Sequence, residues 1–121
     1  MDPRHQKRIK ILQQLYAYFF YHDQKEDFDE KTLKIIIHQD KINKYIDNFS
    51  VKFKVDKIAK IDLVILQIAI YDLIIEKKEP PKVIIDEAVE LAKEFGGERS
   101  YAFVNAILGK VYSYVLKLDK K

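Results

Sequence analysis

The stretch from Pro80 to Lys110 constrains the fold of this chain more than any other part of the sequence. Pro80 and Pro81 can end one helix and open the next, because the first helical turn suits the proline φ and needs no amide partner there. Gly96 stands where a left-handed helix cap is expected, and Ser100 can cap a following helix. Apolar residues recur at three- and four-residue steps on both sides of this corner: Val83, Ile84, Ala88, Leu91, Ala92 and Phe95 before it, and Phe103, Val104, Ile107, Leu108 and Val111 after it. The stretch therefore predicts two amphipathic helices joined by a glycine corner.

Helix signals dominate the rest of the chain as well. Three Gly and three Pro are too few to supply the turns of a small all-β protein. We predict an all-α bundle of six helices, of which the first four span Pro3–His22, Phe28–His38, Asp40–Phe53 and Asp56–Lys77 and the last two form the corner described above. Asp2 is the expected cap of the first helix. The fourth helix is apolar on nearly all sides, so we expect it to be the most buried element.

The composition is that of an ordinary globular chain, with 48% hydrophobic and 34% charged residues. A length of 121 residues predicts one domain, or two small subdomains that share a core. Cysteine is absent, which excludes disulfides and thiolate metal sites and is compatible with a reducing cytoplasm. No signal peptide is expected, and the most apolar stretch, Ile61 to Ile75, is too short to span a bilayer. The net charge of +3 permits an anionic partner without requiring one.

A helical projection of the first helix separates two faces. The predicted core face carries Ile9, Leu12, Leu15, Tyr16, Phe19 and Phe20, and the predicted solvent face carries Lys7, Lys10, Gln14, Tyr18 and Tyr21. Lysines beside exposed tyrosines suit single-stranded nucleic acid, because cations neutralise phosphates while aromatic rings stack on bases. Arg4 and Arg8, one turn apart, add forked donors for phosphate. The alternative is a solvated amphipathic face with half-buried tyrosines, and the residues by themselves favour it.

Catalytic and metal-binding patterns find little support in the sequence. His5, His22 and His38 have neither cysteine partners nor the spacing of a metal-binding histidine motif. Ser100 is better explained as a helix cap than as a nucleophile. We therefore expect no enzyme activity, no metal and no cofactor.

The Pro80–Lys110 stretch resembles the C-terminal signature of the NusB family of bacterial transcription antitermination factors. The matching positions, in order, are Lys82, Val83, Ile85, Glu87, Ala88, Val89, Glu90, Leu91, Ala92, Lys93, Phe95, Gly96, Ser100, Phe103, Val104, Asn105, Leu108 and Lys110. The run from Ile61 to Leu73 is similar to a second family motif, and two N-terminal runs, Arg4–Arg8 and Gln13–Tyr16, are similar to a third. Only the middle of the chain, from Tyr21 to Val55, carries no signature.

The resemblance implies a fold of two packed three-helix subdomains, about residues 1–54 and 55–121. It also implies a cytoplasmic, non-enzymatic factor that binds the single-stranded boxA RNA of ribosomal RNA leader transcripts together with the ribosomal protein NusE. The pair would help to load the antitermination complex on RNA polymerase. The residues that the resemblance and the helix-one face nominate for RNA binding are Arg4, His5, Lys7, Arg8, Lys10, Gln14, Tyr18 and Arg99, and those nominated for the partner protein are Asp62, Glu87, Glu90 and Glu94.

Other functions stay open at this point. A similar domain forms the N-terminal RNA-binding part of a ribosomal RNA cytosine-5 methyltransferase, and 121 residues would allow such an enzyme only as a fragment. A helical interaction protein that has lost RNA binding is a further alternative, against which Arg4, Lys7, Arg8 and Tyr18 argue. The resemblance also allows a homodimer that would cover the RNA-binding face.

The chain departs from the family pattern at several positions. His5 and Gln67 each stand where the pattern has Arg, Ala106 replaces a Gly, and Gly109 replaces an Asp. Arg99 lies in a loop where acidic residues are common in relatives. These departures leave the predicted fold intact and bear on the strength of each RNA contact.

Overall fold

The structure, a computed structural model, describes residues 2–22 and 27–119 of the chain. Within these ranges it contains six α-helices and no strand, so the predicted all-α class is confirmed. The helices are α1 (Pro3–Phe20), α2 (Glu30–Ile37), α3 (Gln39–Phe49), α4 (Lys60–Ile70), α5 (Pro81–Phe95) and α6 (Ser100–Asp119). A short 3₁₀ turn, η1 (Val55–Lys57), precedes α4, and a π-helical segment, η2 (Tyr71–Glu76), continues it. None of the described helices is long and apolar enough to cross a membrane.

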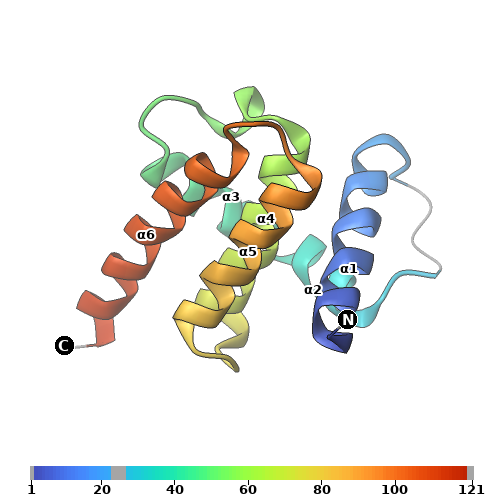
Figure 1. Ribbon diagram of the computed structural model, residues 1–121, viewed down its shortest axis with the longest axis horizontal. Coiled ribbons are helices and arrows are strands. Elements are labelled where there is room, and N and C mark those ends of the chain that lie inside the picture. Colours follow the sequence, from blue (N-terminus) through green and yellow to red (C-terminus); the bar gives the residue numbers. More distant parts are fainter. Residues whose placement is uncertain (1, 23–26, 120–121) are drawn as a thin grey trace.

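Helix α4 is the centre of the fold, as its composition predicts. It packs against α1, α3, α5 and α6, and Figure 1 shows α1 and α6 on opposite sides of the molecule. Every residue from Asp62 to Ile70 is buried. The core that forms around α4 draws on the other helices through side chains such as Leu15, Ile35, Ile46, Leu91 and Leu108. Each large apolar side chain buried in this way stabilises the fold by about 1.5–3 kcal/mol.

A polar side chain in the middle of α4 is satisfied by α3. Gln67 is 1% exposed, its Nε2 donates to Asn43 Oδ1 at 3.0 Å, and its Oε1 accepts from Gln39 Nε2 at 3.4 Å. A buried amide without partners would destabilise the fold, whereas this one is held by neutral amides on both ends. These partners explain how a neutral side chain is accommodated where the family pattern has Arg.

Several helix boundaries differ from the predicted ones, and after α3 side chains of the loop take part in the backbone hydrogen bonding. Helix α1 ends at Phe20 rather than at His22, and α2 is shorter than predicted at both of its ends. Helix α3 ends at Phe49 rather than at Phe53. Beyond it the Ser50 hydroxyl donates to the Phe53 carbonyl, and Asp47 Oδ1 accepts the Val55 N–H at 2.8 Å. The predicted cap at Asp2 is confirmed, since its Oδ1 accepts the Arg4 N–H at 2.9 Å.

The predicted fourth helix is divided into η1, α4 and η2, and its last turn is wider than an α-helix. It stops at Lys77, whose left-handed φ of 55° turns the chain while its N–H donates to the Asp72 carbonyl at 2.9 Å. Short π-helical segments of this kind are frequent at functional sites. Here the segment carries Asp72 and Glu76 toward the N-terminal helices.

The corner between α5 and α6 is present, but its glycine acts differently from the prediction. Gly96 has φ −90° and ψ −175°, an extended conformation, so the predicted left-handed cap is wrong. A Cβ at Gly96 would lie 2.5 Å from Ser100 Cβ and 2.7 Å from the Ala92 carbonyl oxygen, so glycine is required for space. The Ser100 hydroxyl accepts the Gly97 N–H at 2.9 Å. Its hydrogen bond therefore closes the loop before α6, which corrects the predicted capping of a helical amide.

The buried face of α1 is rotated relative to the predicted one. Its buried residues are Arg8, Ile11, Leu12 and Leu15. Tyr16 is 39% exposed and Phe20 is 57% exposed, so their predicted core placement is wrong. Tyr18, expected in solvent, is half-buried against Phe28 and His22, with ring centroids 6.5 and 5.1 Å away. The rotation arises because α1 packs on α4 and α2 together, and Phe28, just before α2, packs against Tyr18.

The two glycines near and within α6 provide a matched test of this packing. We expect Gly96→Ala to lower the free energy of unfolding by about 1–3 kcal/mol, because its Cβ would overlap Ser100 and Ala92. Gly109→Ala should instead raise it by about 1 kcal/mol, because a Cβ there meets no atom within 4 Å and alanine favours the helix. Urea unfolding of both variants measures the difference, and equal effects would contradict the steric explanation for Gly96.

Candidate nucleic-acid interface

The first turn of α1 is attached to α5 by a histidine between two carboxylates. His5 Nδ1 lies 3.0 Å from Glu87 Oε2, and His5 Nε2 lies 3.0 Å from Glu94 Oε2. The hydrogen bond with Glu87, followed by that with Glu94, raises the pKa of His5. Protonation of His5 therefore strengthens the attachment of α1 to α5.

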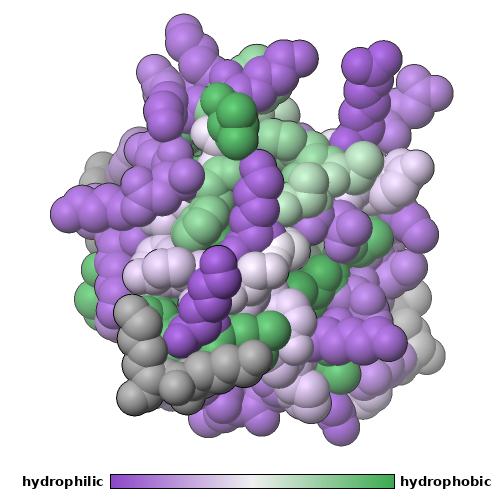
Figure 2. Space-filling model, turned by 90° about the vertical axis from the view of Figure 1, so that its left-hand side faces the viewer, coloured by the Kyte–Doolittle hydropathy of each residue, from purple (hydrophilic) through white to green (hydrophobic). Residues whose placement is uncertain are grey.

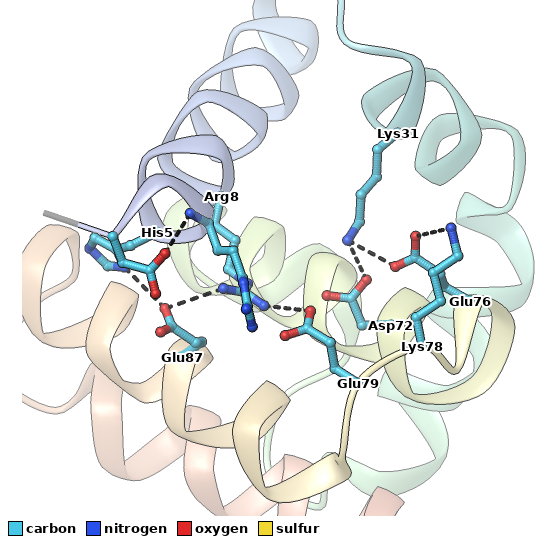
Figure 3. A network of polar contacts seen from close by, with 10 residues as sticks. His5, Arg8, Lys31, Asp72, Glu76, Lys78, Glu79 and Glu87 are labelled. Carbon is cyan, nitrogen blue, oxygen red and sulfur yellow. Dashed lines mark hydrogen bonds and ion pairs between the residues drawn. The ribbon is translucent and has the colours of Figure 1, made fainter.

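Arg8 makes the second attachment one turn further along α1. Its side chain is 8% exposed, with Nη2 2.6 Å from Glu79 Oε1 and Nη1 3.7 Å from Glu87 Oε2 (Figure 3). Glu79 lies just before α5 and Glu87 lies within it. Arg8 thus points into the molecule and holds three chain segments together, and its charge is already compensated there.

A second network joins α2 to the π-helical segment. Lys31 Nζ lies 2.6 Å from Asp72 Oδ1 and 3.0 Å from Glu76 Oε2, and Lys78 Nζ lies 3.7 Å from Glu76 Oε1 (Figure 3). Burial raises the pKa of Asp72 to about 7, although Lys31 acts in the opposite direction. Burial alone would lower the pKa of Lys31, but the two carboxylates outweigh it and raise that pKa. The protonation states of Lys31, Asp72 and Glu76 therefore depend on one another.

Gln14 and Tyr18 attach α1 to the start of α2. Gln14 Oε1 accepts from the Asp29 N–H at 2.9 Å and from the Thr32 hydroxyl at 2.6 Å. The Tyr18 ring packs on Phe28 at the same place. These two side chains, which the sequence nominates for RNA binding, thus also position α2 beside α1.

Three cations of α1 remain at the surface. Arg4, Lys7 and Lys10 are exposed, and none of them forms an ion pair with any residue in the described ranges 2–22 and 27–119. We call these three residues the α1 cation row. Arg4 and Lys7 border a shallow hollow of about 220 Å³, which Lys31, Lys78, Glu76 and Glu79 also line. Tyr21, at the far end of α1, is 61% exposed.

The structure does not bring all the nominated residues together. Arg99 is exposed in the loop between α5 and α6, and no described contact joins it to the α1 cation row. Among the carboxylates nominated for the partner, Glu87 and Glu94 are engaged with His5, and Asp62 is buried in the first turn of α4. Glu90 is exposed and lies 3.9 Å from Lys93.

Four residues that complete the two networks were not predicted from the sequence: Lys31, Asp72, Glu76 and Glu79. A carboxylate in an apolar helix signals a need for a cation, because a buried charge is rarely left unpaired. On this ground Asp72 could have been predicted to need a cation. The sequence does not show that this cation is Lys31, because Lys31 lies on another helix. Within the described ranges, no group of three or more His, Asp or Glu residues could hold a metal ion.

Comparisons with known proteins place the chain in a family. The model of the NusB family matches residues 6–113. The transcription antitermination protein NusB of Agathobacter rectalis is 42% identical over 88 residues, which cover 73% of this chain and 67% of that protein. The protein of the same name from Finegoldia magna is 44% identical over 86 residues, which cover 71% and 63%. The chain therefore belongs to the NusB family, and it matches about two-thirds of the length of these relatives.

A solved structure agrees with this assignment. T. maritima NusB superposes on the chain with a TM-score of 0.77 and 29% identity, over 91% of this chain and 90% of that one. The relatives carry the name of transcription antitermination proteins, which denotes regulatory factors and not enzymes.

We expect Arg8→Ala to lower the free energy of unfolding by about 2–3 kcal/mol, because it leaves Glu79 and Glu87 without their partly buried cation. Arg4→Ala is the matched control and should change that free energy by no more than about 0.5 kcal/mol, since Arg4 is exposed. Thermal and urea unfolding provide the measurement. Equal stability of the two variants would show that Arg8 has no structural role.

A second prediction concerns pH. Because the folded-state pKa of Asp72 is raised to about 7 from 3.8, the folded protein binds more protons there, and stability should fall as pH rises between these values. Asp72→Asn cannot titrate, so the stability of the wild-type protein relative to this variant should decrease over this interval and then level off. Urea unfolding at several pH values tests this. A constant difference across the interval would contradict it.

Proposed function

We propose that this protein is a cytoplasmic antitermination factor that binds the single-stranded boxA RNA of ribosomal RNA leader transcripts together with the ribosomal protein NusE. In this proposal the two proteins help to load the antitermination complex on RNA polymerase. Membership of the NusB family and the name of its relatives support it. The structural observation that carries it is the α1 cation row.

The α1 cation row supplies the electrostatic part of the proposed RNA contact. Arg4, Lys7 and Lys10 have no carboxylate partner among the described residues, so an approaching phosphate need not displace one. Tyr21, just beyond the end of α1, has an exposed ring that can stack on a base. His5 and Arg8 have a different part in this proposal, because their bonds to α5 fix the orientation of the helix that carries the row.

The proposed contact with NusE needs a surface other than the paired carboxylates. Tyr16 and Phe20 form an exposed aromatic pair with ring centroids 5.4 Å apart. Exposed aromatic rings on one helix face are typical anchors of protein–protein interfaces. Lys60, at the start of α4, lies 5.3 Å from the neighbouring Phe19 ring. We therefore place the partner contact along this edge of α1 and α4, with the exposed Glu90 as a further charge.

The salt dependence of RNA binding tests the proposed cation row. The triple variant Arg4→Ala, Lys7→Ala and Lys10→Ala should bind boxA RNA more weakly and lower the slope of log affinity against log salt by about 2, at about 0.7 for each phosphate contact. The control variant Lys57→Ala, Lys82→Ala and Lys93→Ala removes the same charge elsewhere and should retain most of the affinity and slope. Fluorescence anisotropy with labelled RNA gives both quantities.

The same titration, repeated with NusE present, tests the second half of the proposal. RNA affinity of the wild-type protein should rise by about tenfold or more, and by linkage RNA should tighten the contact between the two proteins equally. Equal RNA affinity with and without NusE would contradict the proposed cooperativity. Unchanged RNA affinity and salt slope in a folded triple variant would show that the α1 cation row does not bind the RNA.

A further inference from the structure

A groove runs between α3 and α6. Figure 1 shows α6 on the side of the molecule opposite α1. It consists of two hollows of about 540 and 300 Å³ that share Phe49 and Tyr114. Along α6 it is lined by Asn105, Ala106, Gly109, Lys110, Ser113, Tyr114 and Lys117, all of which are exposed. We call this feature the α3–α6 groove. No described element covers it, and none of the residues discussed above for RNA or NusE lines it.

The floor of the α3–α6 groove is apolar and preformed. Tyr45, Phe49 and Tyr114 pack on one another with ring centroids 5.6–6.4 Å apart. Ala106 and Gly109 continue the floor along α6 with little or no side chain. Figure 2 looks onto the α6 side of the molecule, where hydrophobic surface lies between projecting hydrophilic side chains. The groove thus has the apolar centre and polar rim of a protein-binding surface.

The rim carries charge of one sign. Lys41 and Lys44 lie on the α3 side, and Lys110 and Lys117 lie on the α6 side. Among the described residues that line the two hollows there is no Asp or Glu. None of the four lysines forms an ion pair with a residue in the described ranges, and Lys110 Nζ has only the Phe49 carbonyl at 3.5 Å. A second copy that met this groove with its own groove would place lysines against lysines. The charge is instead complementary to an acidic partner.

Gly109 shows that a partner backbone has room to approach. A Cβ at this position would have no atom within 4 Å, so the glycine is not required by packing inside the chain. A glycine within a helix nevertheless lowers helix stability by about 1 kcal/mol relative to alanine. Small residues on an exposed helix allow another helix to come close, and Ala106 and Ser113 flank Gly109 on the same face.

We infer that the α3–α6 groove binds an acidic amphipathic helix of a partner protein. Asn105 to Lys117 spans about 18 Å of α6, which matches about three turns of such a helix. Its apolar stripe would lie on Phe49, Tyr114 and Gly109, and its Glu or Asp side chains would meet the lysines on both rims. RNA fits less well, because the aromatic rings of the floor pack against one another and do not present open faces for stacking.

A designed peptide probe tests this inference. The probe is a fluorescein-labelled helical peptide of about 14 residues with a leucine stripe flanked by glutamates, compared with the same peptide carrying lysines in their place. We expect only the glutamate peptide to bind. Gly109→Leu, which fills the floor, and the pair Lys110→Glu and Lys117→Glu, which reverses the rim, should each weaken binding by about tenfold or more.

The controls separate this site from the RNA face. The pair Lys57→Glu and Lys82→Glu changes the net charge equally outside the groove and should leave peptide affinity within about twofold. Circular dichroism checks that each variant is folded, and both groove variants should retain the boxA RNA affinity of the wild-type protein. Absence of glutamate-peptide binding to the folded wild-type protein, or equal binding by wild-type and groove variants, would overturn the inference. Loss of boxA RNA binding in the groove variants, but not in the Lys57→Glu and Lys82→Glu pair, would assign the groove to RNA instead. A change of oligomeric state in Gly109→Leu would assign it to self-association.

Discussion

The burial of α4 is the constraint on which the rest of the structure depends. A helix that is buried from Asp62 to Ile70 must be surrounded, so α1, α3, α5 and α6 all pack against it. Its polar side chains then select particular neighbours, because a buried polar group needs a hydrogen bond. Gln67 is satisfied by amides of α3, and Asp72, just beyond α4, forms an ion pair with Lys31 of α2. The other helices thus pack on the apolar surface of α4. The polar groups on and just after α4 determine how α3 and α2 are positioned.

The cations of the N-terminal helix divide into two groups with different physical roles. His5 and Arg8 face α5 and are compensated by carboxylates, so they position the helix. Arg4, Lys7 and Lys10 are exposed and form no ion pair within the described ranges 2–22 and 27–119, so they can attract an anion. The division follows from the helical period, because some residues of α1 turn toward the carboxylates around α5 while others turn toward solvent. A motif that reads as one basic cluster in the sequence is therefore part scaffold and part proposed binding surface.

The proposed RNA face and the α3–α6 groove lie on opposite sides of the molecule (Figure 1). A protein with two such surfaces can hold an RNA and a protein at once without competition between them. Linking the two binding events raises the effective concentration of each ligand near the other. This arrangement suits an adaptor that brings a transcript to a larger assembly, and it requires no chemistry from the chain itself.

The sequence by itself determined the helical class, the central place of α4 and the pairing of α5 with α6. These features depend on apolar periodicity and on Pro and Gly positions, which act over a few neighbouring residues. Only the tertiary structure decided that Tyr16 is exposed and Tyr18 is half-buried, because the answer depends on Phe28, just before α2, packing against one flank of α1. It likewise decided that Gly96 is needed for space and that Arg8 pairs with Glu79, 71 residues away. Such contacts join segments that are distant along the chain, and no local pattern records which segments will meet.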